Sequence, residues 1–123
     1  MVAGAVLLAL GTAIGAFGAH VLKPRLAPER FDILQTAVLY QFINALGLLI
    51  LGALATQRAD RGLRLAANLL LAGVLLFCGS LYLLLAGAPR LLGVVTPVGG
   101  LCLIAGWCVA AVALSRHSPA PQA

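Results

Sequence analysis

The sequence predicts an all-α membrane protein in which four transmembrane helices form a compact antiparallel bundle. Of its 123 residues, 63% are hydrophobic and only 9% are charged, whereas a soluble domain is about 45–50% apolar and about 25% charged. The apolar residues form four long stretches, each close to the roughly 20 residues that cross a hydrocarbon core. Every charged residue lies between or beyond these stretches.

The first stretch covers residues 2–22. It begins without the Lys or Arg leader that a secretory signal carries, so we expect a retained helix. The charged segment 23–32 contains Pro24 and Pro28, and proline interrupts a helix. Because Pro28 also fits the first turn of a new helix, an interfacial turn is expected to lead into the second span, 33–55.

The polar segment 57–64 leads to the third span, 65–85, and a tight turn at 86–90 leads to the last apolar stretch, 91–114. In that stretch Thr96-Pro97 has two interpretations. Pro97 could kink a long helix, or Thr96 could cap a helix that begins at Pro97, which would make 91–95 a lead-in and is slightly favoured. Residues 1–115 are therefore read as one domain, and the polar tail 116–123 is expected to be disordered.

The formal net charge is +5. Its cations are scattered through the short loops, as is typical of membrane proteins, rather than gathered on a face with interleaved aromatic residues, as a nucleic-acid site requires. The pattern therefore argues against nucleic acid as a partner and favours contact with membrane lipid. An even number of spans places both termini on one side, and the acids beside Lys23 slightly favour the cytoplasm for that side.

Small residues recur at helical spacing, which favours close helix contacts in lipid. Gly11, Gly15 and Ala19 are spaced by four, as are Thr12, Ala16 and His20. Whether these contacts form within one chain or between copies stays open. The residues predicted to pack helices together are Gly11, Gly15, Gly18, Gly79, Gly99, Gly100 and Gly106.

Polar residues inside the spans form a second pattern, since they are costly in hydrocarbon without partners. Thr36, Tyr40 and Asn44 lie at successive steps of four on the second span, and antiparallel packing would bring the end of the first span beside the start of the second. The predicted cluster is either an interhelical hydrogen-bond network or a ligand site. It comprises His20, Gln35, Thr36, Tyr40, Gln41, Asn44, Ser80 and Tyr82.

No catalytic, cofactor-binding or metal-binding set emerges. The spans contain no Asp or Glu, the chain has two histidines, and its three cysteines include no C-x-x-C pair. No G-x-S-x-G elbow or Walker loop occurs. We therefore predict that the chain is not an enzyme and has no cofactor, while an active site shared with a partner subunit stays open.

Six motifs spread over all four spans resemble a small bacterial membrane-protein family, the domain of unknown function 423, to which the eukaryotic transmembrane protein 256 is similar. They are GAFGAH (15–20), TAVLYQF (36–42), ALGLL (45–49), GSLYLL (79–84), TPVGG (96–100) and AGW (105–107). The resemblance implies a multi-pass protein of the cytoplasmic (inner) membrane with no assigned reaction or cofactor. The family commonly has His where this chain has Asn44, so a role that needs an imidazole there is in doubt here.

Two functional hypotheses follow. The first is a non-enzymatic membrane protein that acts through helix association with itself, with a membrane complex or with lipid. The alternative is a binder or transporter of a small molecule or lipid, which would use the polar cluster at the ends of the first two helices.

Overall fold

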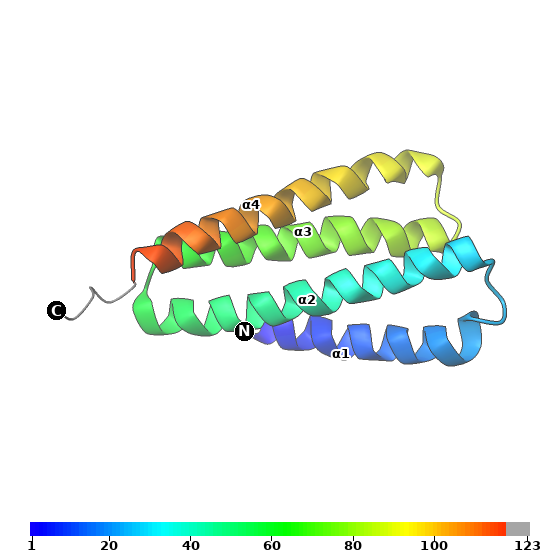
Figure 1. Ribbon diagram of the computed structural model, residues 1–123, viewed down its shortest axis with the longest axis horizontal. Helices are drawn as coiled ribbons and strands as arrows, with labels where there is room; N and C mark the ends of the chain where they lie inside the picture. The colour runs from blue at the N-terminus through cyan, green and yellow to red at the C-terminus, as the bar shows by residue number, and fades with distance from the viewer. Residues whose placement is uncertain (118–123) are drawn as a thin grey trace.

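The computed structural model describes residues 1–117, which form four α-helices joined by short connections (Figure 1). These are α1 (Val2–Phe17), α2 (Pro28–Arg58), α3 (Arg61–Leu85) and α4 (Val95–Ser115). A π-helical turn, η1 (Gly18–Leu22), extends α1, and a 3-10 turn, η2 (Arg90–Val94), precedes α4. Residues 1–117 contain no strand, and consecutive helices run antiparallel, so the predicted fold class is confirmed. Residues 118–123 of the tail that we expected to be disordered lie outside the described part.

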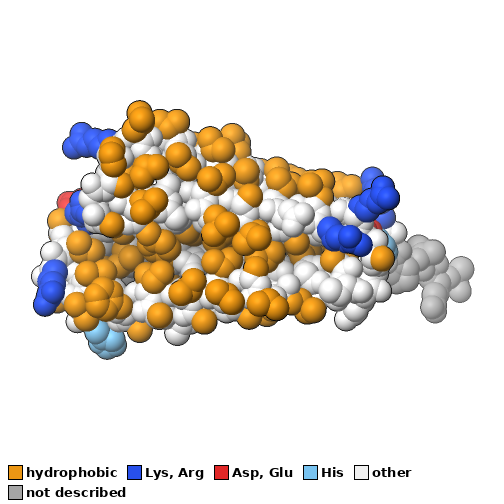
Figure 2. Space-filling view, turned by 180° about the vertical axis from the view of Figure 1, so that it is seen from behind, with side chains coloured by type: hydrophobic (Ala, Val, Ile, Leu, Met, Phe, Trp, Pro, Cys, Tyr) orange, Lys and Arg blue, Asp and Glu red, His pale blue; other side chains and the backbone are white. Residues whose placement is uncertain are grey.

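Four helical segments are long and apolar enough to cross a membrane: Val2–Leu22, Pro28–Arg58, Arg61–Leu85 and Arg90–Ser115. Hydrophobic side chains cover the length of the molecule, while Lys and Arg gather at its two ends (Figure 2). We call the end that holds the last turn of α4 the terminal end; its charged residues are Arg58, Asp60, Arg61, Arg64 and Arg116. The opposite end carries Lys23, Arg25, Glu29, Arg30, Asp32 and Arg90. This apolar band between two charged ends is the surface that a bilayer requires.

The helices pack in chain order, α1 on α2, α2 on α3 and α3 on α4. Their buried residues recur at steps of three and four, the 3.5-residue repeat by which helices pack at shallow crossing angles. In α4 these residues are Gly99, Leu103, Gly106, Ala110 and Ala113. In α1 and its π-helical extension they are three glycines seven residues apart, Gly4, Gly11 and Gly18. The buried face of α1 is thus backbone rather than side chain.

The second helix is longer than the predicted span because it begins at Pro28, in its first turn, and ends at Arg58. Its 31 residues measure about 46 Å, so its polar first turns extend beyond a hydrocarbon core of about 30 Å. From there the Arg30 guanidinium donates a hydrogen bond to the Leu85 carbonyl at 2.6 Å. A cation at this position stabilises the last turn of α3.

The start of α4 differs in detail from both interpretations of Thr96-Pro97. A lead-in precedes the helix, as the slightly favoured one required, but it is the 3-10 turn 90–94 and α4 begins at Val95. Pro97 therefore lies in the first turn, where backbone N–H groups have no partner within the helix and no kink is needed. Thr96 is not the cap, because the N-cap position is Val94. The Thr96 hydroxyl instead lies 2.6 Å from that of Ser80 on α3.

Candidate functional site: polar contacts inside the bundle

The buried face of α2 carries two polar residues near the middle of the helix. Gln41 is 2% exposed and Asn44 is 3% exposed. They occupy the same seam as the apolar side chains that pack α2 on its neighbours. That seam comprises Leu34, Ala37, Gln41, Asn44, Leu48 and Leu51, again at steps of three and four. Both amides therefore face helices rather than lipid.

Gln41 joins three helices. Its side-chain amide N–H donates to the Leu7 carbonyl of α1 at 2.7 Å, and its amide oxygen accepts from the Tyr82 hydroxyl of α3 at 2.5 Å. Gly11 makes the first contact possible, since a Cβ atom at that position would lie 3.3 Å from the Gln41 amide nitrogen. A larger residue at position 11 would press on the amide over the α1 backbone.

Asn44 adds the fourth helix. The indole N–H of Trp107 on α4 donates to the Asn44 amide oxygen at 2.8 Å, while the Asn44 amide donates to the Tyr40 carbonyl at 2.8 Å. Gly47 gives the indole its space, because a Cβ atom there would lie 2.5 Å from the ring. One turn of α2 thus holds hydrogen bonds to α1, α3 and α4, and we call these four side chains, Gln41, Asn44, Tyr82 and Trp107, the polar hub.

Two further contacts join neighbouring helices. The Cys78 thiol donates a hydrogen bond to the Ala37 carbonyl of α2, with 3.3 Å between sulfur and oxygen. Ser80 and Thr96 share a hydrogen bond between α3 and α4. Every buried side-chain nitrogen and oxygen in residues 1–117 has a hydrogen-bond partner. Each such bond contributes about 0.6–2 kcal/mol in a membrane, so their first effect is to fix how the helices pack.

The predicted polar cluster is therefore divided among several places. Gln41 and Tyr82 are bonded to each other, Asn44 is bonded to Trp107, and Ser80 is bonded to Thr96. Tyr40 places its ring 4.8 Å from that of Phe77. The remaining members, His20, Gln35 and Thr36, are exposed, and no hydrogen bond within residues 1–117 joins their side chains to the others.

The predicted packing glycines have different surroundings. A Cβ at Gly99 would overlap the Phe77 backbone, and one at Gly106 would lie 2.9 Å from Leu70. Gly18 lies against Leu34, Gly15 against Val38 and Gly11 against Gln41. By contrast, Gly100 has only ring atoms of Phe77 at 3.8 Å or more, and Gly79 has no atom of the described chain within 4 Å.

Sequence reasoning missed Gly4 and Trp107. A Cβ at Gly4 would lie 2.9 Å from the Ala45 carbonyl oxygen, so this glycine allows the backbones of α1 and α2 to approach closely. The seven-residue spacing to Gly11 and Gly18 was the signal that could have found it. Nothing in the sequence pairs Trp107 with Asn44, because the two residues are 63 positions apart and meet only through the fold.

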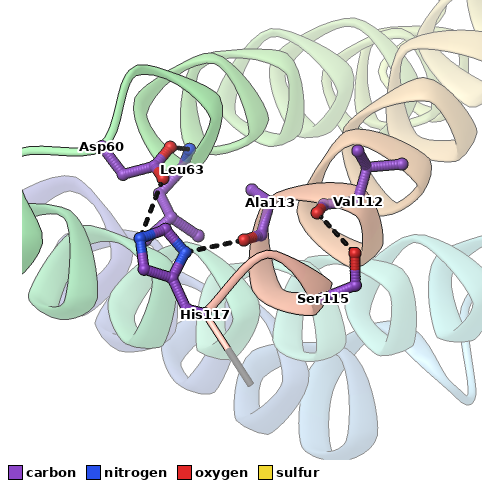
Figure 3. A network of polar contacts seen from close by, with 6 residues as sticks. All are labelled: Asp60, Leu63, Val112, Ala113, Ser115 and His117. Atoms are coloured by element: carbon purple, nitrogen blue, oxygen red, sulfur yellow. Dashed lines mark hydrogen bonds and ion pairs between the residues drawn. The ribbon is translucent and has the colours of Figure 1, made fainter. Parts of the chain in front are cut away.

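A second polar network closes the terminal end (Figure 3). Asp60 caps α3 by accepting from the Leu63 N–H at 3.0 Å, and its other oxygen lies 3.3 Å from His117 Nε2. His117 Nδ1 lies 2.8 Å from the Ala113 carbonyl. Each ring nitrogen therefore lies beside an oxygen acceptor. His117, which we had assigned to the tail, thus belongs to the folded body.

The bond from Leu63 is the largest cause that holds the pKa of the Asp60 carboxyl below its usual value. The Gly62 N–H and the charges of His117 and Arg116 act in the same direction, and desolvation opposes them. The network favours the charged carboxylate at the amino end of α3, where the helix dipole also stabilises it.

The remaining residues with reactive or metal-binding side chains include the three cysteines. Cys78 is buried, Cys102 is half-buried and Cys108 is exposed, and all three are free thiols. Within residues 1–117, no three His, Cys, Asp or Glu side chains come together as a metal site would need.

These observations define a class of protein: an integral membrane protein of four transmembrane helices whose buried polar groups bind one another. The chain belongs to the family described as "Protein of unknown function (DUF423)", which matches residues 14–100, so the resemblance seen in the sequence is confirmed. No solved structure matches it.

Three relatives cover most of the chain. The UPF0382 membrane protein SH2409 of Staphylococcus haemolyticus is 39% identical over 87% of each chain. The UPF0382 membrane protein YwdK of Bacillus subtilis is 35% identical over 95% of this chain and 96% of its own. The UPF0382 inner membrane protein YgdD of Escherichia coli is 38% identical over 85% of this chain and 79% of its own. These names describe membrane proteins and assign no reaction.

Proposed function

We propose that this chain is a non-enzymatic protein of the cytoplasmic membrane that acts by associating with a second copy of itself through the outer face of α1. A row of small, exposed residues along this helix is the observation that carries the proposal. The row consists of Ala5, Ala9, Thr12, Ala16 and Ala19.

The row has the geometry of a helix contact. Its members follow one another at steps of four and three, the same repeat that the buried residues of α4 use against α3. The Thr12 hydroxyl donates to the Leu8 carbonyl at 2.8 Å, so this position adds no unsatisfied donor to the face. The bulky exposed residues Val6, Leu10 and Phe17 lie on a different strip of the helix, so the small row would let a second backbone approach closely.

The packing of α1 within residues 1–117 also leaves one of its faces available to a second helix. It packs on α2 by the glycine line described above, and only 17% of the residues in its most apolar stretch are buried. The corresponding share for α2 is 39%. A helix with small residues on two faces and a neighbour on one of them is suited to bind a second helix on the other.

The polar hub favours association over ligand binding. Its side chains use their hydrogen bonds on other helices of the same chain. Gln41, Asn44 and Tyr82 of the alternative hypothesis therefore use their hydrogen bonds for packing. Its other members His20, Gln35 and Thr36 lie exposed near the ends of α1 and α2. The name of the Escherichia coli relative supports a location in the inner membrane. Each end of the molecule carries four Lys or Arg residues, and the acids beside Lys23 slightly favour both termini in the cytoplasm.

Disulfide cross-linking in native membranes tests the proposal. In a two-fold dimer α1 meets its own copy, so Ala9→Cys and Ala16→Cys, made in a Cys102→Ala, Cys108→Ala background, should form a species of twice the 12.6 kDa chain mass. Val6→Cys and Phe17→Cys, which are also exposed but lie on the bulky strip, are the matched controls and should stay monomeric. Equal cross-linking of both strips, or of neither, would contradict an α1 interface.

A further inference from the structure

We infer that the groove between α2 and α3 at the terminal end is a binding site for the phosphate of an anionic phospholipid. The groove has a volume of about 450 Å³ and is lined by Thr56 and Ala55 on α2 and by Arg64, Ala67 and Asn68 on α3. The groove does not include the polar hub.

The groove has a wall of small apolar residues and a rim of polar side chains. Ala55 and Ala67 are small, which leaves space between the two helices. Arg64 and Asn68 are four residues apart on α3 and therefore point to the same side. Thr56 faces them from α2, and its hydroxyl already donates to the Ala53 carbonyl at 2.7 Å, so its oxygen is available to accept a hydrogen from a headgroup.

The chemistry of the rim suits a phosphate. The Arg64 guanidinium and the Asn68 amide present N–H donors, and no carboxylate lines the groove. Arginine pairs with phosphate through two parallel hydrogen bonds, which lysine or a neutral side chain cannot reproduce.

Within residues 1–117, no carboxylate pairs with the positive charge of Arg64. Asp60, the acid nearest in sequence, is engaged by the Leu63 N–H and by His117. In residues 1–117 Arg64 has no ion-pair partner within 4 Å. An anionic group entering the groove would therefore meet an arginine that has no competing carboxylate.

The depth of the site matches a lipid headgroup. Arg64 lies one turn, about 6 Å, inside the Asp60 cap, and Asn68 lies one turn further. The long arginine side chain can therefore hold its charge at the membrane surface while its stem lies along apolar residues. Basic pockets between transmembrane helices are a recognised means of binding anionic headgroups. Free phosphate offers the same oxygens without acyl chains, so the test must distinguish the two sources.

The test measures binding of phosphatidylglycerol to the purified full chain in neutral detergent, by retention of the lipid in native mass spectrometry. Salt of about 1 M shortens the screening length to ~3 Å, which suppresses general attraction of lipid to a basic surface. We expect phosphatidylglycerol to bind at least about tenfold more tightly than phosphatidylcholine or inorganic phosphate, as charge-assisted hydrogen bonds predict.

Two variants with matched charge locate the site. Arg64→Gln should weaken phosphatidylglycerol binding about tenfold or more, whereas Arg61→Gln, which removes the same charge outside the groove, should change it less than about twofold. Asn68→Leu removes the amide at nearly constant volume and should also weaken binding. Helical circular dichroism of each variant confirms that the protein is folded.

Other outcomes would overturn the inference. Equal losses in the Arg61 and Arg64 variants would show attraction to the whole surface rather than a site. Binding of inorganic phosphate as tight as that of the lipid would show a site for the free anion. Retention of phosphatidylcholine equal to that of phosphatidylglycerol would show that charge is not recognised. Each result is separate from the proposed α1 interface, because the small row of α1 does not line this groove.

Discussion

The Gln41 side chain joins α2 to two other helices by hydrogen bonds, because its amide donates to α1 and accepts from α3. In water such bonds compete with solvent, but hydrocarbon offers no replacement partner. The side chain therefore favours one arrangement of the three helices over others in which its donor or acceptor would be unsatisfied.

A double-mutant cycle measures this contribution. Gln41→Leu removes the acceptor of the Tyr82 hydroxyl, and Tyr82→Phe removes the donor. We expect a coupling free energy of about 0.6–1.7 kcal/mol, the range for hydrogen bonds between membrane helices, measured from unfolding in mixed micelles titrated with sodium dodecyl sulfate. Gln35→Leu on the exposed face of α2 is the control and should not couple with Tyr82→Phe. Strictly additive effects of the Gln41 and Tyr82 changes would show that the bond does not stabilise the fold.

Replacement of glycine by alanine should change the stability of the protein differently at Gly99 and at Gly79. Gly99→Ala places a methyl group 2.8 Å from the Phe77 Cα atom, so α3 and α4 must separate, at a cost of about 1–3 kcal/mol. Gly79→Ala meets no atom of the described chain and should be neutral or stabilising by up to ~1 kcal/mol, because alanine favours helix. The same unfolding titration compares the two variants, and equal losses would contradict the packing described for Gly99.

At the scale of the element, α2 shows what sequence spacing can and cannot determine. The sequence predicted its helix and its polar residues, but the stripe of Thr36, Tyr40 and Asn44 assumed a constant step of four. Four residues advance about 40° beyond a full turn, so such a stripe drifts around the helix. The buried seam alternates three and four, and it holds Gln41 and Asn44 while Thr36 and Tyr40 are exposed.

The starts of α3 and α4 show a second limit. Pro97 indicated a nearby helix start, and the structure confirms one. The partner of Thr96 could not be read locally, because its hydroxyl contacts Ser80 on another helix. In the same way Asp60 is a recognisable helix cap by residue type, whereas its contact with His117 depends on the last turn of α4 lying beside the start of α3.

This contact predicts that acid destabilises the terminal end. Folding lowers the pKa of Asp60, chiefly through the Leu63 N–H, so the folded state binds the proton less tightly than the unfolded state does. The resulting stabilisation is complete above the usual aspartate pKa of about 4 and is lost as the pH falls through the lower folded pKa. Below pH 4 the temperature of unfolding should therefore fall.

Two replacements separate the charge from the cap in that experiment. Asp60→Ser keeps a side-chain acceptor for the helix but removes the titrating group, so its unfolding temperature should depend less on pH below 4 than that of the parent chain. Asp60→Ala removes both and should be less stable than the serine variant at neutral pH. An acid response identical in the parent and serine chains would contradict this role for Asp60.

At the scale of the whole molecule, the polar hub lies near the middle of α2, and charged residues mark the two ends. Composition and charge placement were sufficient to predict the four spans, because exclusion of charge from hydrocarbon acts on every residue of a span. They could not identify which glycines meet a neighbour, since Gly79 and Gly99 have the same local chemistry and differ only in what the fold places opposite them.

Labelling of single cysteines with a membrane-impermeant maleimide tests the four-span arrangement most directly. The chain should first be made free of its own cysteines at 102 and 108, leaving the buried Cys78. Cysteines at Ala27 and Ala88 should be labelled from one side of the membrane and a cysteine at Ala59 from the other, while one at Leu48 should stay unlabelled until the protein is unfolded. Labelling of Ala27→Cys and Ala59→Cys from the same side, or of Leu48→Cys in intact membranes, would contradict the account.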